Sequence, residues 1–263
     1  MKTDRQLIVR HFPDPPKTLD VYPIADVHLG AAEHCAKEWQ AFLTAIRANP
    51  NAYLILSGDM INNATRSSVS DVFEETMRPS EQKKLMAEML EPLRDRILAA
   101  VPGNHERRSG KDADDDPLYD IMAKLDLEEL YRRNLAVVKL QMGDLHGNSA
   151  MNPTYTLATT HGAGGGIYTG AAVNRTERFG NVIEGADVLI TGHSHKAFIT
   201  KPSKLQINKQ HDVVVQRPYY AIGLSSWMDY GGYATQKMLL PSSNMAQVIH
   251  LGGKRFSISV EAA

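Results

Sequence analysis

The sequence predicts an α/β fold, and three observations lead to that prediction. In the first 106 residues a strand-like apolar run, a short polar site and a helix follow one another three times. The runs at residues 53–56 and 97–101 are continuously apolar, as expected for strands buried on both faces of a parallel sheet. Each polar site follows the C-terminal end of a run, and open α/β sheets bind their ligands at that edge.

The first half of the chain is predicted to alternate between strands and helices. Strands are expected at residues 7–9, 19–25, 53–56 and 97–101. Between the second and third of them, apolar residues recur at i, i+3, i+4 and i+7 and predict a helix: Trp39, Phe42, Leu43 and Ile46. A second helix is expected at residues 80–95, where Pro92 kinks or restarts it.

The second half is expected to contain mostly strands. Residues 107–117 are polar and predict a loop, and helices are expected at about residues 117–134. Further elements are a strand pair at 137–142 and 154–158, a helix at about 171–178 and a strand at 187–190. After Phe198 only strands are expected, at residues 205–207, 213–215, 219–222, 247–251 and 256–260.

Length and composition favour one globular domain. The 263 residues suit a single large α/β domain, no linker or repeat marks a second one, and we expect residues 1–263 to form one unit. No segment approaches the ~18 apolar residues of a membrane span, and residues 1–5 lack the apolar run and cleavage site of a signal peptide, so secretion is not expected. Cys35 is the single cysteine, which excludes an internal disulfide and favours a cytoplasmic protein. The net charge of −1 argues against a protein that grips long nucleic acid.

Five short segments with Asp or His follow strand-like runs. They are Asp26-Val27-His28, Gly58-Asp59, Gly103-Asn104-His105-Glu106, His161-Gly162 and Gly192-His193-Ser194-His195. Gly103 is expected to provide a sharp turn, because glycine tolerates dihedral angles that other residues resist. Alternation of side chains along an extended segment would place Asp26 and His28 on one side, aimed at one metal ion.

These segments supply seven oxygen and nitrogen donors, which is more than one transition metal needs. They are Asp26, His28, Asp59, Asn104, His161, His193 and His195. Such a set suits two divalent ions that share a bridging carboxylate. Imidazole and carboxylate ligands without thiolate point to Mn²⁺, Fe or Zn²⁺ rather than Mg²⁺ or Ca²⁺. Two ions ~3.5–4 Å apart deprotonate a water and stabilise an in-line displacement, which is the chemistry of phosphoester hydrolysis.

The series D-x-H, G-D, G-N-H-E, H-G and G-H-x-H, in this order, resembles the calcineurin-like metallophosphoesterase superfamily. The resemblance covers about residues 19–195. It implies a two-sheet β-sandwich flanked by helices, with four layers in all. It also implies a phosphomonoesterase or phosphodiesterase that acts by attack of a metal-bound hydroxide, with Mn²⁺ as the expected metal.

The resemblance also implies a role for each donor. One ion would be held by Asp26, His28, Asp59 and His195, and the other by Asp59, Asn104, His161 and His193. Asp59 would bridge the two ions, and His105 would contact the substrate phosphate and help the leaving oxygen depart. The pair Asn62-Asn63 departs from the pattern, because many members carry an acidic residue after the Gly-Asp pair.

The substrate is expected to be a small or flexible phosphoester. Asn104, Arg107 and Arg108 are the expected substrate contacts, because both arginines directly follow the G-N-H-E motif and suit bidentate phosphate binding; Arg66 could join them. The arginines could instead face water or pair with nearby carboxylates. An extended polyanion would be repelled by the acidic residues that follow, Asp112, Asp114, Asp115 and Asp116.

Two other functions remain open from sequence. One is a nuclease that resembles the DNA-repair branch of this superfamily, which usually carries a DNA-capping domain after the last histidine motif. The other is an inactive scaffold, which should show broken ligands, and none is broken here. His34 could approach the substrate, whereas Asp144-Leu145-His146 copies the D-x-H spacing between two expected hairpin strands. The oligomeric state does not follow from the sequence.

Overall fold

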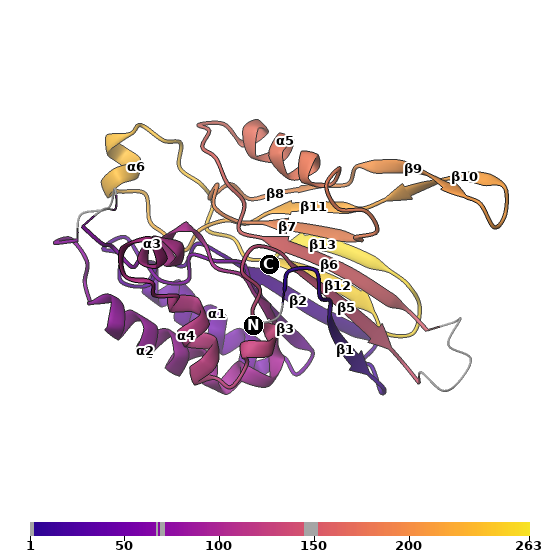
Figure 1. Cartoon of the computed structure of the whole chain (residues 1–263), viewed down its shortest axis with the longest axis horizontal. Coiled ribbons are helices and arrows are strands. Elements are labelled where there is room, and N and C mark those ends of the chain that lie inside the picture. Colours follow the sequence, from indigo (N-terminus) through magenta and orange to yellow (C-terminus); the bar gives the residue numbers. More distant parts are fainter. Residues whose placement is uncertain (1–2, 67, 69–71, 145–151) are drawn as a thin grey trace.

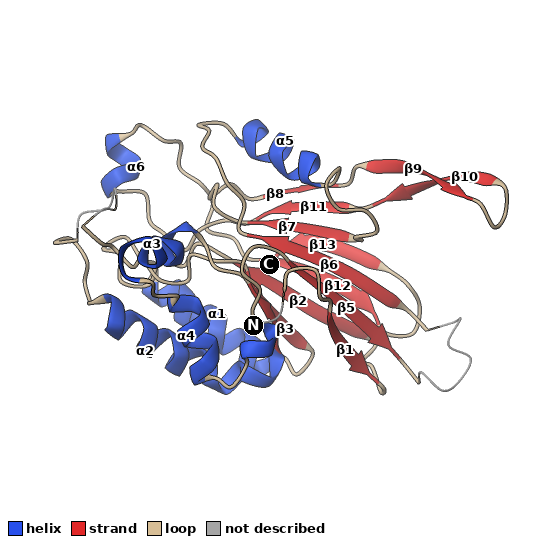
Figure 2. Ribbon diagram, in the orientation of Figure 1, coloured by secondary structure: helices blue, strands red, loops and turns tan. Residues whose placement is uncertain are grey.

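Two β-sheets packed face to face, with helices on both outer faces, form the body of the protein (Figures 1 and 2). The structure is a computed structural model that describes residues 3–66, 68, 72–144 and 152–263. One sheet has five strands in the order β13 (Ile258–Ala262), β12 (Gln247–Gly252), β2 (Thr18–Ile24), β3 (Ala52–Leu56) and β4 (Ile97–Ala100).

The second sheet has six strands. Their order is β1 (Ile8–Phe12), β5 (Ala136–Met142), β6 (Thr154–Thr160), β7 (Val188–Thr191), β11 (Tyr220–Gly223) and β8 (Phe198–Thr200). A separate antiparallel ribbon of β9 (Ser203–Asn208) and β10 (Val213–Pro218) extends away from the sandwich (Figure 1).

An apolar core fills the space between the two sheets. Val21 and Ile55 of the five-stranded sheet are fully buried in it, together with Leu140, Leu157 and Ile190 of the six-stranded sheet. Packing of the sheets removes the apolar inner face of each sheet from contact with water, and this burial stabilises the sandwich.

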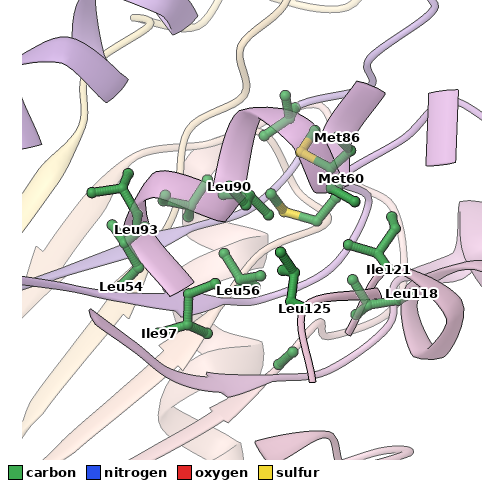
Figure 3. Close-up of a cluster of buried hydrophobic side chains, with 14 of the residues drawn as sticks. Leu54, Leu56, Met60, Met86, Leu90, Leu93, Ile97, Leu118, Ile121 and Leu125 are labelled. Atoms are coloured by element: carbon green, nitrogen blue, oxygen red, sulfur yellow. The ribbon is translucent and has the colours of Figure 1, made fainter. Parts of the chain in front are cut away.

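Helices cover the outer faces and complete four layers. On the five-stranded sheet lie α1 (Ala36–Ala48), α2 (Pro79–Leu90) and α4 (Pro117–Lys124), and Figure 3 shows Leu54 and Leu56 of β3 among side chains of α2 and α4. On the six-stranded sheet lies α5 (Thr169–Phe179), which contacts β7 and β11. The expected α/β sandwich flanked by helices is therefore confirmed.

Three local predictions were wrong. The expected loop at 107–117 is largely helical, because α3 (Asn104–Ala113) begins within the G-N-H-E motif. The helices expected at about residues 117–134 cover less of that range than predicted: α4 ends at Lys124, and only a 3-10 turn, Glu128–Leu130, follows it. A short helix, α6 (Gly232–Gln236), interrupts the C-terminal strands. Elsewhere, α2 passes into a 3-10 turn at Glu91–Arg96, where Pro92 restarts the helix as expected.

The sheet topology directs several strand ends toward one place. Strands β2, β3 and β4 are parallel neighbours, and so are β6 and β7 in the other sheet. The polar segments identified in the sequence follow these five strands directly. Across the sandwich, the Ser57 and Thr159 hydroxyls are hydrogen-bonded at 2.7 Å in the buried interior. Within the described part of the chain, no helix combines the length and hydropathy that a membrane span requires.

Candidate metal centre

All seven donors predicted from the sequence come together at this edge of the sandwich. The loops after β2, β3 and β4 bring Asp26, His28, Asp59 and Asn104, and the loops after β6 and β7 bring His161, His193 and His195. Three triads have ligand atoms within 4.8 Å of one another: Asp26, His28 and His195; His28, Asp59 and His105; and Asp59, His161 and His193.

Asp26 lies at the centre of the first triad. Its Oδ2 accepts the main-chain N–H of His193 at 2.9 Å, which fixes the carboxylate. Its Oδ1 is buried and accepts no hydrogen bond among the described residues, yet it lies 3.3 Å from His195 Nε2 and 3.8 Å from His28 Nε2. The two imidazole nitrogens face each other at 3.3 Å. Such facing lone pairs need a proton or a cation between them, so this donor set fits a metal ion.

Asp59 connects this triad to the others. Its Oδ1 accepts the main-chain N–H of His105 at 2.8 Å, which leaves Oδ2 directed at the histidines. Oδ2 lies 3.1 Å from His161 Nε2 and 4.0 Å from His28 Nε2. One carboxylate oxygen therefore faces histidines from both sheets, as a bridging ligand would.

The third group of donors surrounds the side-chain oxygen of Asn104. This oxygen lies 2.6 Å from His193 Nδ1 and 3.1 Å from His161 Nε2. The other ring nitrogen of His161, Nδ1, donates to the Ser57 carbonyl at 2.8 Å. That hydrogen bond places the lone pair on Nε2, which faces the cluster, and such outer partners commonly orient metal-binding histidines.

Most of the donors sit in strained backbone conformations. Asp26, His28, Asp59, His193 and His195 all have φ between 49° and 65°. Our expectation that Asp26 and His28 share one side of an extended segment was wrong in its geometry, although the two side chains do meet. Non-glycine residues in the left-handed region are uncommon and cluster at functional sites, where surrounding contacts hold them in place.

Gly103 is required for a different reason from the one expected. Its φ of −88° is ordinary, so it does not provide an unusual turn. A Cβ at this position would lie 2.5 Å from the Asp59 nitrogen and would overlap the Asp59 carboxylate. The absence of a side chain lets the loops after β3 and β4 approach each other closely enough to share the centre.

Glu106 holds these two loops together, a role that was not predicted from the sequence. Its Oε2 accepts N–H groups of Asp59 and Gly103, and its Oε1 accepts those of Met60 and Ile61, at 2.7–3.3 Å. Burial raises the pKa of Glu106 to about 7, while four N–H donors favour the carboxylate. A glutamate three residues after a helix N-cap is a capping-box signal, which could have indicated this role.

The charges of the centre favour a cation. Burial alone would lower the pKa of His161, but the Asp59 and Asp26 carboxylates raise it to about 10. For His195 the effect of burial is likewise outweighed by Asp26, and its pKa is raised. The pKa of His28 is lowered well below its usual value by burial and by neighbouring histidines. The carboxylates thus bind positive charge strongly, while His28 stays neutral and free to act as a ligand.

A cavity of about 890 Å³ opens next to the centre. His28, Asp59, Asn104 and His105 of the centre are among the residues that line it. The segment between β11 and β12, residues 224–246 with α6, supplies many of the other lining residues, an arrangement that was not predicted from the sequence. The cavity provides room for a substrate much larger than inorganic phosphate.

The structure separates the two arginines of the motif. Arg108 lines the cavity, and its Nη1 is buried without a hydrogen-bond partner among the described residues. Arg107 donates to the Arg133 carbonyl at 2.9 Å and is not among the cavity-lining residues. Arg66 lies exposed in a turn.

The other singled-out residues have structural contacts. His34 Nδ1 donates to the Val27 carbonyl at 2.8 Å, and His34 does not line the cavity. Asp115 pairs with Lys83, and Asp116 accepts from the Tyr119 N–H and the Tyr131 hydroxyl. Of the Asp144-Leu145-His146 segment, which copies the D-x-H spacing, Leu145 and His146 lie outside the described residues.

A two-sheet sandwich with clustered Asp, Asn and His donors at its strand ends is typical of metal-dependent hydrolases. The family model for calcineurin-like phosphoesterases matches residues 20–197. The chain therefore belongs to this family and is a metal-dependent phosphoesterase.

Comparison with solved structures gives distant matches. The calcineurin-like phosphoesterase YfkN from Bacillus subtilis is 14% identical, with 94% of this chain and 91% of that chain covered and a TM-score of 0.40. A metallophosphoesterase from Sphaerobacter thermophilus is 15% identical, with 93% and 88% covered and a TM-score of 0.40. Comparison with curated protein sequences finds no significant match.

Proposed function

We propose that this phosphoesterase uses two divalent ions to hydrolyse a small or flexible phosphomonoester or phosphodiester. The observation that carries the proposal is the position of Asp59 Oδ2, between His161 of one sheet and His28 of the other. Asp26, His28, Asp59 and His195 would hold one ion. Asp59, Asn104, His161 and His193 would hold the other. The chemistry that two bound ions supply is activation of a water molecule and neutralisation of phosphate oxygens.

His105 and Arg108 are the proposed contacts to the substrate. The Nδ1 of His105 donates to the Asn62 carbonyl, so its Nε2 is the nitrogen available to the leaving oxygen. Arg108 lines the same cavity with an unpartnered buried Nη1, which suits a charge-assisted hydrogen bond to phosphate. Arg107 is already bonded to a main-chain carbonyl, so we assign the phosphate contact to Arg108.

Mn²⁺ is the metal that we propose first, with Fe or Zn²⁺ as alternatives, because histidine and carboxylate ligands suit all three. We further propose that residues 1–263 act as one domain, since strands after the family-model match complete both sheets. A cytoplasmic location remains a prediction from the single cysteine, whose thiol is buried.

The test is hydrolysis of three substrates by Mn²⁺-loaded protein with and without chelator. Bis(4-nitrophenyl) phosphate, 4-nitrophenyl phosphate and single-stranded DNA separate diesterase, monoesterase and nuclease activity. We expect one of the small esters to be hydrolysed and the activity to disappear with chelator. Inactivity on all three after loading with Mn²⁺, Fe and Zn²⁺ in turn would contradict the proposal. Efficient cleavage of DNA alone would favour the nuclease.

A further inference from the structure

Lys196 is a buried cation that follows the last ligand motif and that the proposed chemistry does not use. Its exposed fraction is 9%, although lysine is rarely this buried without an ionic partner. Among the residues that the structure describes, no carboxylate lies within ion-pair distance of its ammonium. A desolvated charge of this kind is unfavourable unless something else compensates it.

The ammonium group has one hydrogen bond, and Lys196 is among the residues that line the cavity. It donates to the Leu240 carbonyl at 2.7 Å, and both residues line the cavity beside the metal centre. A lysine ammonium has three N–H donors, so two remain available to a ligand. The single hydrogen bond fixes the position of the group without neutralising its charge.

The other cavity-lining residues limit what a ligand can look like. Carboxylates of Glu33, Glu74 and Asp229 line the cavity and disfavour a ligand that is anionic along its whole length. An apolar part of the wall comes from residues on two loops: Ile167, Tyr230, Leu239 and Leu240. A ligand that matches this wall has an apolar middle and anionic groups at separate positions.

We propose that Lys196 binds a second anionic group, a carboxylate or a phosphate, carried by the organic part of the substrate. This inference rests on the proposed function, in which the scissile phosphate occupies the metal centre. The organic part then lies along the apolar wall, and the second anion replaces water at the two unused donors of Lys196. Lys196 thereby sets specificity for phosphoesters with two anionic groups.

The experiment compares esters that differ only in the second anion. Phenyl phosphate, 3- and 4-carboxyphenyl phosphate and 1,4-phenylene bisphosphate are assayed with Mn²⁺-loaded enzyme, with the corresponding methyl diesters as a parallel series. We expect kcat/KM to be about 10–100-fold higher for at least one doubly anionic ester than for its parent, the range of a charge-assisted hydrogen bond. The carboxylate and phosphate arms distinguish the two sources of charge.

Lys196→Met keeps the aliphatic stem and removes the charge. It should abolish the preference while leaving kcat/KM for the parent ester unchanged, and Lys196→Arg should restore part of the preference. Lys201→Met is the control, because Lys201 contacts Tyr220 outside the cavity. An equal loss on parent and doubly anionic esters would overturn the proposal and make Lys196 a support for the Leu240 loop. No preference in the wild-type enzyme would overturn it as well.

A binding measurement separates this inference from the proposed function. Phenylphosphonate and 4-phosphonobenzoate are not hydrolysed, and their affinities can be measured by calorimetry even if no ester is a substrate. Tighter binding of 4-phosphonobenzoate to wild type but not to Lys196→Met supports the inference. Equal binding of the two compounds to wild type overturns it.

Discussion

His105 donates its Nδ1 proton to the main-chain carbonyl of Asn62, with 2.7 Å between nitrogen and oxygen. A carbonyl can only accept, so the hydrogen bond fixes the ring and leaves Nε2 free, 3.9 Å from Asp59 Oδ2. Burial lowers the pKa of His105, with Arg108 acting in the same direction against Asp59. An anionic phosphate next to Nε2 would favour its protonation, which is the state that a proton donor needs.

Replacement of His105 tests this role. We expect His105→Ala to lower kcat by about 10²–10⁴-fold, the usual contribution of a positioned proton donor. Metal content, measured by elemental analysis, should stay at the wild-type level. Because His105 also lies in a triad with His28 and Asp59, loss of metal in this variant would instead identify it as a ligand. His11→Ala is the control, since its ring nitrogen is hydrogen-bonded to the Gly143 carbonyl, away from the metal centre.

Asp59→Asn should remove metal rather than slow one chemical step. The substitution keeps the size of the side chain but removes the negative charge that faces both groups of histidines. We expect elemental analysis to show less than the wild-type metal content, and activity to fall in parallel. Glu33→Gln, which removes a carboxylate from the same cavity outside the cluster, should keep its metal. Equal metal content in wild type and Asp59→Asn would exclude the bridging role.

Metal binding should strengthen as the pH rises. The Asp59 and Asp26 carboxylates raise the pKa of His161 to about 10, so at neutral pH the metal-free protein holds a proton where a cation would bind. A metal ion must displace that proton, and affinity therefore increases from pH 6 to pH 8.5. Calorimetry in buffers with different ionisation enthalpies should show proton release at pH 7. Affinity that does not change over this range would contradict the assignment of His161 as a ligand.

The fold was predictable where apolar residues form the pattern. The continuously apolar β3 was recognised because both of its faces are buried, and the helical spacing of Trp39, Leu43 and Ile46 because one face of α1 is buried. α3 was missed because its buried face consists of Glu106 and Ser109. Both side chains make hydrogen bonds to the neighbouring loops. The sequence of α3 therefore lacks the apolar periodicity from which a helix is predicted.

The centre was predictable in its residue types but not in its geometry. The order of motifs after strands predicted which side chains would meet, since parallel strands bring their C-terminal ends to one edge. The left-handed conformations of Asp26 and His28 were not predictable, because tertiary contacts such as the Asp26 N–H to Gly58 carbonyl bond impose them. The cavity wall of residues 224–246 was missed because loops have no periodicity of their own.

Stability should depend on pH through His250, which lies far from the motifs in sequence. Its Nδ1 is 2.7 Å from Asp20 Oδ1 on β2, and its Nε2 is 3.1 Å from Glu261 Oε1 on β13. Partial burial would lower the pKa of His250, but these two carboxylates raise it above its ordinary value of 6.5. The stabilisation is therefore fully present below pH 6.5 and is lost as the pH rises through the folded-state pKa.

The measurement is the free energy of unfolding in urea, with chelator present, at pH 6 and pH 9. We expect His250→Gln to destabilise the protein by about 0.5–1 kcal/mol at pH 6 and by less at pH 9. His211→Gln, in an exposed turn, is the control and should leave the free energy of unfolding at pH 6 close to the wild-type value. A larger effect of His250→Gln at pH 9 than at pH 6 would show that the ion pairs do not stabilise the fold.

The donors of the centre come from both sheets, and this has a consequence for how the two layers stay together. Asp26 and Asp59 follow strands of one sheet, whereas His161 and His193 follow strands of the other. Ions bound between them would cross-link the layers beside the buried Ser57–Thr159 hydrogen bond and would stabilise the folded state by mass action. A substitution that loosens the apolar packing between the sheets would then weaken metal affinity without changing a ligand. Metal affinity would therefore report how tightly the two sheets pack against each other.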